Sequence, residues 1–254
     1  NGSVLAWADQ SGHGNDFLQR LATNNSPQLA EAALNGNPVM RFDGVNDYLT
    51  NSYLPTGQVT VLIVRRYQAF GAKQSLLNCH KTTTPDGGFY LGVGGMASPY
   101  NSQALFTACG GAWCSGVSTQ DAGILTTDWA VDTLRISAGN TMFWTDGVLK
   151  TNNAAHGSIT AGRGLVLGAN ADALPANPFN GDVAEILVYN RALSDSELTL
   201  ATGYLGAKYN SAPVVNAGPD KTITLPMAAE LNGTVTDDGY PVYGSLASVW
   251  TVVS

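Results

Sequence analysis

Charged side chains are scarce in this sequence: they make up 12% of the 254 residues, about half the share found in an ordinary soluble domain. The 12 Lys and Arg residues are outnumbered by 19 Asp and Glu residues, which gives a formal net charge of -7. A protein that binds nucleic acid or an anionic membrane surface needs clustered cations to neutralise phosphates. The composition therefore argues against both kinds of partner.

Long apolar runs and an export signal are also missing. The longest largely apolar run covers residues 59–64, far short of the roughly 20 residues that a membrane-spanning helix requires, so membrane insertion is not expected. The chain opens on Asn1 and shows no basic start followed by an apolar core, so we expect it to be a piece of a longer protein. A hydrophobic content of 44% excludes a disordered chain.

Cysteine is rare, with only three residues in the chain. Cys109 and Cys114 bracket a short loop that a disulfide could close, and Cys79 would then remain outside the pair. The cellular compartment decides whether such a pair persists, so the pairing stays open. Four residues between the two cysteines are a poor spacing for a zinc site.

Strand signals dominate what is present. Residues 59–64 combine β-branched side chains with continuous hydrophobicity, which predicts a strand buried on both faces. Asp146 and Gly147 separate two strand-like stretches and predict a tight hairpin, because both residue types tolerate a positive φ. Further strands are expected at residues 164–168 and 183–189.

The stretch 183–189 bears on catalysis. Simple alternation places Glu185 on the same face as Val183, with Arg191 or a loop amide as its expected partner. The i, i+3 spacing of Asp182 and Glu185 places them on opposite faces of a strand, which is the wrong geometry for the paired carboxylates of a glycosidase. No nucleophile-elbow or zinc-protease motif is present. We therefore expect no catalytic residues, with a polysaccharide hydrolase or lyase as the less favoured alternative.

One helix is expected near the end of the β-rich region. Ser194 and Glu197 form a capping box, in which each side chain satisfies a free backbone donor of the other residue. Apolar residues then recur at helical spacing, and the helix is expected to end near Tyr209 because Pro213 prevents its continuation. After this point the sequence changes to extended stretches separated by turn residues, which predicts two domains at residues 1–210 and 211–254.

Three separated blocks carry a family resemblance. They are W-A-D-Q-S-G-H-G-N-D at 7–16, R-F-D-G-V-N-D-Y-L at 41–49 and F-N-G-D-V-A-E-I-L-V-Y-N-R-A-L-S at 179–194. In this order the blocks resemble the bacterial laminin-G-like domains of the concanavalin A-like superfamily. The resemblance covers residues 1–210 and implies an all-β jelly-roll sandwich of two antiparallel sheets with one short C-terminal helix. Such families usually carry one more strand before Trp7, which this sequence lacks.

Residues 213–226 and 231–239, together with Trp250, resemble the first half of a PKD-like immunoglobulin-type repeat. Such repeats are spacers and adhesion modules, so the resemblance implies a secreted or cell-surface multidomain bacterial parent. A complete sandwich of this type takes about 100 residues, so the segment 211–254 is expected to form only part of one. A strand from a neighbouring chain could complete it, which makes self-assembly as a structural or adhesive module the alternative function.

The fold alone does not decide the function, because this sandwich hosts binders as well as enzymes. We predict a non-catalytic module that binds carbohydrate or another surface ligand. Exposed aromatic faces and polar side chains are expected in the long glycine-rich loops between residues 86 and 116, since long loops on a rigid sandwich commonly carry binding sites. The expected ligand-binding residues are Phe89, Tyr90, Tyr100 and Trp113, with His80 and Asn101 beside them.

Calcium is the expected cofactor if the acidic turn after residue 41 binds a cation. Asp43, Asn46 and Asp47 can present oxygens there, and Asp182 would join them across the sheet. Alternatively, the same residues only shape the turn into the next strand. The sequence leaves both interpretations open.

Overall fold

Two antiparallel sheets of seven strands each form the body of the protein, which confirms the predicted sandwich. The computed structural model describes residues 2–19, 23–70, 73–79, 88–93, 105–106, 127–153, 159–160, 163–171, 173–209, 213–224, 226–237 and 248–251. Within these ranges no helix is long and apolar enough to cross a membrane.

The first sheet, sheet A, contains the longer strands. They are β3 (Gln28–Leu34), β4 (Asn37–Asp43), β7 (Val59–Tyr67), β11 (Ala130–Ser137), β12 (Asn140–Thr145), β13 (Val148–Asn153) and β16 (Asn180–Tyr189). Their order across the sheet is β13-β12-β11-β7-β16-β4-β3. β16 therefore lies inside sheet A, between β7 and β4.

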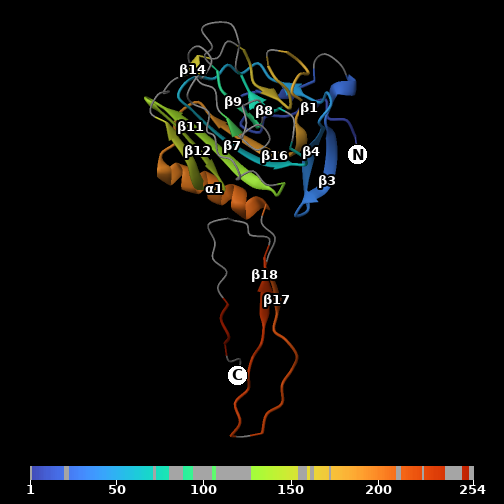
Figure 1. The fold of residues 1–254 in the computed structure, drawn as a ribbon, viewed down its shortest axis with the longest axis vertical. Coiled ribbons are helices and arrows are strands. Elements are labelled where there is room, and N and C mark those ends of the chain that lie inside the picture. Colours follow the sequence, from blue (N-terminus) through green and yellow to red (C-terminus); the bar gives the residue numbers. More distant parts are fainter. Residues whose placement is uncertain are drawn as a thin grey trace.

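The second sheet, sheet B, is built from shorter strands. They are β1 (Ala6–Trp7), β2 (Phe17–Leu18), β5 (Leu49–Thr50), β8 (Gln74–Asn78), β9 (Tyr90–Val93), β10 (Leu105–Phe106) and β15 (Val166–Leu167), in the order β1-β2-β5-β15-β8-β9-β10. The remaining elements are β6 (Thr56–Gly57), β14 (Ile159–Thr160), β17 (Val214–Asn216), β18 (Thr234–Thr236), a 3-10 helix η1 (Thr23–Asn25) and the helix α1 (Asp195–Tyr209). Figure 1 shows α1 lying along sheet A beside β11 and β12.

Both faces of β7 are buried, each in a different hydrophobic core, as its sequence predicts. Val61 and Ile63 pack into the core between the two sheets, whereas Leu62 and Val64 pack into a second core beneath α1. All four side chains are at most 1% exposed. β7 is therefore the strand that joins the sandwich to the helix.

The predicted hairpin and helix start are also confirmed. Asp146 and Gly147 take φ values of 48° and 65° between β12 and β13. At the start of α1, the Glu197 amide donates to Ser194 Oγ at 3.3 Å and the Ser194 amide donates to Glu197 Oε2 at 2.9 Å. The last described helical residue before position 213 is Tyr209, where the sequence predicts the end.

β16 departs from the expected alternation, because it contains a β-bulge at Ala184. Val183 lies opposite Arg65 of β7, and Glu185 lies opposite the adjacent residue Val64. Ala184 is therefore an extra residue on β16 with no partner position on β7. Val183 consequently faces the core between the sheets, whereas Glu185 faces the side of α1. The prediction that both share one face was wrong, since a bulge reverses the phase of every later residue.

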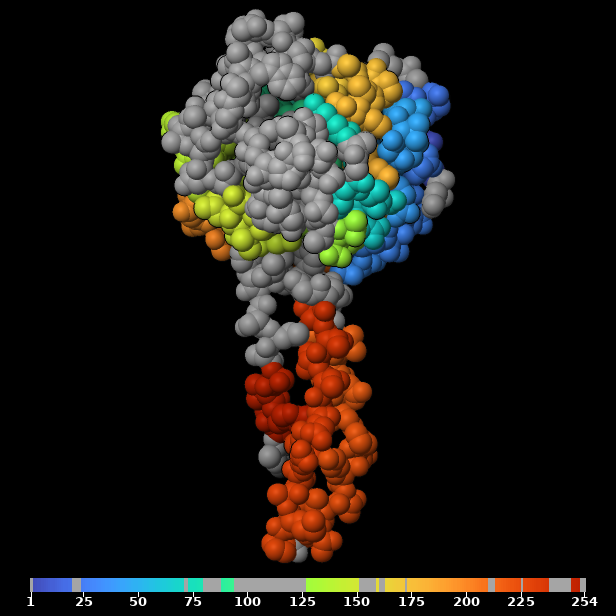
Figure 2. Space-filling view, viewed as in Figure 1, coloured from blue at the N-terminus to red at the C-terminus, as the bar shows by residue number. Residues whose placement is uncertain are grey.

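The C-terminal strands β17 and β18 form a separate two-stranded sheet. Figure 2 shows this segment, in orange and red, projecting from the rounded body. Its large apolar side chains are exposed, among them Val215 at 69% and Trp250 at 52%. The domain division at residue 211 and the PKD-like resemblance stay predictions.

Candidate functional site

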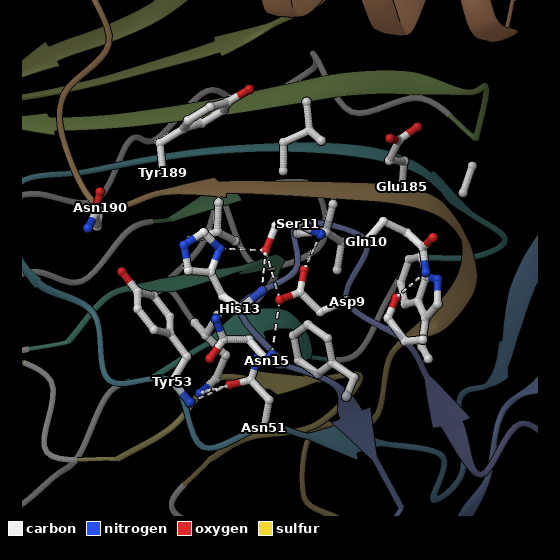
Figure 3. A pocket seen from close by; sticks show the side chains of 18 of the residues that line it. Asp9, Gln10, Ser11, His13, Asn15, Asn51, Tyr53, Glu185, Tyr189 and Asn190 are labelled. Carbon is white, nitrogen blue, oxygen red and sulfur yellow. Dashed lines mark hydrogen bonds between the residues drawn. The ribbon is translucent and has the colours of Figure 1, made fainter.

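A groove of about 570 Å³ follows the second half of β16. β4 pairs with one edge of β16 only from Asn180 to Val183, whereas β7 pairs with the other edge as far as Tyr189. Among the described strands, none pairs with the first edge beyond Val183, and residues 184–190 line the groove there. We call this feature the β16 groove; it is shown in Figure 3.

Residues 8–16, here called the Asp9 loop, form the opposite wall. The Asp9 carboxylate accepts hydrogen bonds from the backbone of Asn15 at 3.0 Å and of Ser11 at 2.8 Å, and another from Ser11 Oγ at 2.8 Å. These bonds, the one from Asn15 first, lower the pKa of Asp9 to about 2. The loop turns through Gly12 and Gly14, whose φ values are 83° and 71°. The wall is therefore held by an ionised carboxylate at its centre.

Further side chains converge from the Asp9 loop. His13 Nδ1 lies 3.0 Å from Ser11 Oγ, and Figure 3 shows both side chains turned toward Asp9. His13 and Gln10 are exposed, so their polar atoms are accessible to a bound molecule. They add an imidazole and an amide to this wall.

Aromatic and amide side chains complete the groove. Tyr53 and Trp7 are half-buried at the margin of the inter-sheet core, and Tyr189 is half-buried at the end of β16. The Asn51 carboxamide oxygen accepts the Tyr53 amide at 3.1 Å and the Leu165 amide at 3.2 Å, which fixes the backbone beneath Tyr53. These three partly exposed rings border the groove alongside fixed polar groups, and the buried ring of Phe17 also lines it.

Glu185 anchors the helix side of the groove. Its carboxylate accepts hydrogen bonds from Lys208 Nζ at 2.9 Å, Tyr209 OH at 2.9 Å and Tyr204 OH at 3.0 Å. Burial lowers the pKa of Lys208, but its hydrogen bonds to Glu185 and Tyr204 outweigh burial and leave the pKa raised. The expected partner Arg191 instead bonds Glu197, at 2.7 Å and 2.8 Å. The expectation of a paired Glu185 is confirmed with a different partner.

The predicted ligand-binding aromatics are only partly described. Phe89 and Tyr90 are 0% and 1% exposed, so the prediction that they stack on a ligand was wrong. Phe89 packs in the core between the sheets, whereas Tyr90 is buried with its OH hydrogen-bonded to Ser75 Oγ. His80, Tyr100, Asn101 and Trp113 lie outside the described residues, as do Cys109 and Cys114.

The residues predicted to bind calcium fall into two groups. Asp43 Oδ1 accepts the amides of Val45 and Asn46 at 2.7 Å and 3.2 Å, while the Asp43 amide donates to Asp47 at 2.9 Å. These hydrogen bonds between side chains and backbone amides stabilise the turn at residues 43–47. Burial, more than the neighbouring Asp43, raises the pKa of Asp47 to about 6. In the described part of the chain no three His, Cys, Asp or Glu side chains are grouped to hold a metal ion.

Asp182 has an ion-pair role. Its fully buried carboxylate accepts Arg41 Nε at 2.8 Å and also bonds the Arg66 guanidinium. The two guanidinium groups take up its oxygens, so the prediction that Asp182 joins a cation site with Asp43 is not supported by its contacts. The bulge also overturns the expected opposition of the two β16 carboxylates, because Asp182 and Glu185 both lie on the α1 side of sheet A. Each is neutralised by a neighbouring cation.

Sequence reasoning missed the β16 groove. Its residues come from 7–17, 51–53, 165, 184–190 and 208, which only the fold brings together. The D-Q-S-G-H-G-N-D block at 9–16 was a usable signal, since a carboxylate followed by Ser and two glycines is typical of a tight hydrogen-bonded loop. That block served only as a family marker.

A family model described as the concanavalin A-like lectin/glucanases superfamily matches residues 43–199. No curated protein matches the chain in sequence. Domain 4 of a GH43 extracellular arabinanase from Geobacillus stearothermophilus, solved with arabinotriose, is similar at 17% identity and a TM-score of 0.52; the match covers 68% of this chain and 80% of that chain.

Two enzymes have similar structures over part of their length. A GH54 α-L-arabinofuranosidase soaked with a cyclic sulfate inhibitor matches at 15% identity and a TM-score of 0.63, covering 93% of this chain and 61% of that one. A Trypanosoma rangeli sialidase in complex with sialic acid matches at 13% identity and a TM-score of 0.54, covering 78% of this chain and 31% of that one. At these identities the likenesses show a shared fold alone.

Proposed function

Because the chain belongs to the concanavalin A-like lectin/glucanases superfamily, we propose that it is a non-catalytic module that binds carbohydrate in the β16 groove. The observation that carries the proposal is the groove itself, where four aromatic rings, one of them the buried Phe17, and several fixed polar groups border about 570 Å³. Small-molecule sites typically enclose about 300–1,000 Å³, with mostly apolar walls and a few oriented polar groups. The similar arabinanase domain holds arabinotriose, which supports a saccharide as the ligand class.

The groove offers the two kinds of contact that a sugar needs. Tyr53 and Trp7 present ring surface to the apolar C–H faces of a saccharide on the inter-sheet side of β16, and Tyr189 does so on the α1 side of the same strand. Tyrosine and tryptophan also bring a polar atom. Donors and acceptors for hydroxyl groups come from Gln10, from Asn190 and from the backbone edge of β16 that no described strand covers. A saccharide would thus stack its C–H faces on the aromatic rings and form hydrogen bonds through its hydroxyl groups.

The non-catalytic part of the proposal rests on the carboxylates. A glycosidase needs one acid and one base or nucleophile free to reach the glycosidic bond, about 5–9.5 Å apart. Asp182 is buried between two arginines, and Glu185 is hydrogen-bonded to Lys208 and two tyrosines. Asp9 is occupied by its own loop. In the described residues around the groove, no two carboxylates are free in this sense.

We further propose that the module belongs to a secreted or cell-surface multidomain protein. The support is the resemblance of residues 213–239 to half of a PKD-like repeat and the arabinanase domain's place in an extracellular enzyme. A bound calcium ion remains part of the proposal, because Asp43 and Asp47 lie close together in one turn. The binding experiment therefore includes a chelator.

The test is isothermal titration of the 254-residue chain with neutral plant oligosaccharides, beginning with arabinotriose and following a glycan-array screen. Tyr53→Ala and Tyr189→Ala each remove one ring from the groove and should weaken binding by about 1–3 kcal/mol. Trp250→Ala is the matched control, because Trp250 is an exposed aromatic residue in the C-terminal segment. It should leave the affinity unchanged.

Two further comparisons locate the site. Tyr100→Ala and Trp113→Ala should not affect binding if the groove is the site. Loss of binding in those variants, with Tyr53→Ala unaffected, would move the site to the loops predicted from the sequence. Loss of binding with chelator alone would place calcium in the ligand site or beneath it.

A second candidate function follows from the edge of β16 beyond Val183, with which none of the described strands pairs. An extended strand from another polypeptide could pair with this edge, as strand addition does at other exposed sheet edges. Half-buried Ile186 and Val188 would then gain cover from the added strand. This outcome would make the protein a structural or adhesive module, and sedimentation would show association of a folded chain that binds no saccharide.

A further inference from the structure

Three lining side chains of the β16 groove are carboxylate or ammonium groups: Asp9, Glu185 and Lys208. Asp9 is satisfied by its own loop and presents a fixed negative charge. Lys208 is 40% exposed and its ammonium group lies 2.9 Å from Glu185, whose side chain is 15% exposed. The two carboxylates outnumber the single ammonium group, so the groove is net negative.

We infer that the β16 groove selects neutral saccharides over acidic ones, and that Glu185 is the residue that sets this preference by neutralising Lys208. The inference rests on the proposed carbohydrate binding and names the ligand class of that same site. A sugar carboxylate in the groove needs a cation that is free to pair with it. Lys208 is the only ammonium or guanidinium group among the described lining residues, and its charge is already taken by Glu185.

Geometry makes Glu185 the controlling partner. Its carboxylate is held by three donors, two of them the hydroxyl groups of Tyr204 and Tyr209, so it stays in place whether or not a ligand is bound. Lys208 also lies over the Tyr204 and Tyr209 rings, 5.6 Å and 5.4 Å from their centroids, which keeps its ammonium group at the groove. Removing the charge of Glu185 therefore leaves a cation in position without a counter-charge.

The experiment titrates matched pairs of sugars that differ in charge. The probes are trigalacturonic acid with its trimethyl ester, sialyllactose with lactose, and arabinotriose as a further neutral ligand. For the wild-type chain we expect binding only among the neutral members, with an affinity that is the same in 20 mM and 500 mM NaCl, because screening does not act on an uncharged ligand.

Two variants and a control separate charge masking from a structural effect. Glu185→Gln removes the charge but keeps one amide oxygen as an acceptor, while its NH2 group can donate to a tyrosine hydroxyl oxygen. The variant should raise the affinity for the acidic probes by roughly fivefold or more, in a salt-dependent manner. Glu185→Gln combined with Lys208→Gln should lose this gain. Glu197→Gln removes the carboxylate that pairs with Arg191, a pair that does not line the groove, and should not produce the gain.

Each outcome decides the matter. An acidic probe that binds the wild-type chain as tightly as its neutral counterpart overturns the inference and leaves carbohydrate binding standing. A folded Glu185→Gln variant with no gain for any acidic probe also overturns it. Absence of binding by every saccharide to the folded wild-type chain overturns the proposed function itself.

Discussion

The buried ion pair between Arg65 and Asp132 predicts a large and specific loss of stability. Arg65 Nε and Nη2 donate to the two Asp132 oxygens at 2.7 Å and 2.8 Å, and Thr145 Oγ1 donates to the same carboxylate at 2.9 Å. Both charged side chains are 1% exposed. Among the described residues, Arg65 Nη1 and the nearby Tyr67 OH have no hydrogen-bond partner, so the two buried charges depend on each other.

Removing one partner should therefore cost much more than removing both. Arg65→Met leaves the Asp132 carboxylate buried without its counter-ion, and Asp132→Leu does the same to the guanidinium. Each single change should lower the free energy of unfolding by about 3–5 kcal/mol. The double variant has no buried charge, and should recover most of this loss because apolar replacements of a buried pair are often neutral.

Urea unfolding followed by tryptophan fluorescence measures these differences, with the m-value checking that the denatured state is unchanged. Arg191→Met provides the control, because Arg191 pairs with Glu197 at the surface with side chains 52% and 39% exposed. That pair should contribute little to stability, because solvent screens an exposed ion pair. If Arg65→Met costs no more than Arg191→Met, or if the single losses simply add in the double variant, the reasoning is refuted.

Three further predictions concern pH and packing. Asp47→Asn should raise the free energy of unfolding by roughly 1 kcal/mol at pH 8 but not at pH 4. The reason is that Asp47 has a folded-state pKa of about 6, so its ionised form is unfavourable above that pH. Urea midpoints measured across this pH range test the prediction. Asp9→Ala should cost roughly 1–2 kcal/mol at pH 7 and less at pH 2, where Asp9, with a pKa of about 2, is partly protonated and its contribution is being lost. Gly164→Ala should destabilise the fold by about 1–3 kcal/mol, because the new Cβ would lie 1.9 Å from the Asn51 carbonyl oxygen. Gly203→Ala on α1 is the comparison: its Cβ meets nothing within 4 Å, so this variant should stabilise the fold. Thermal unfolding of the two variants measures both effects.

Local patterns in the sequence were sufficient to predict much of the fold. The burial of β7, the Asp146-Gly147 turn and the Ser194–Glu197 cap all depend on neighbours within a few residues. The family resemblance supplied the two-sheet arrangement that such local signals do not contain. These predictions held because propensity, periodicity and turn chemistry agreed with the overall fold.

The site could not be predicted in the same way. The β16 groove joins the Asp9 loop to β16, about 175 positions apart in the sequence, at a sheet edge that only the strand order reveals. Phe89 and Tyr90 lie beside glycine-rich sequence, which suggested exposure, yet both are buried, and Phe89 packs in the core between the sheets. Exposure of an aromatic side chain depends on the opposite sheet, and the local sequence does not report what that sheet covers.

The bulge at Ala184 has a consequence for insertions and deletions in this chain. With the bulge, Glu185 faces the helix side while Val183 and Ile186 face the core. Deleting Ala184 would remove the extra residue and restore regular alternation, with Val183 still opposite Arg65 and Glu185 still opposite Val64, so each side chain would keep its face. Deleting a residue from the regular part of the strand, such as Leu187, would instead move the residues that follow it to the opposite faces. The strand should therefore tolerate the loss of its bulged residue better than the loss of a regularly paired one.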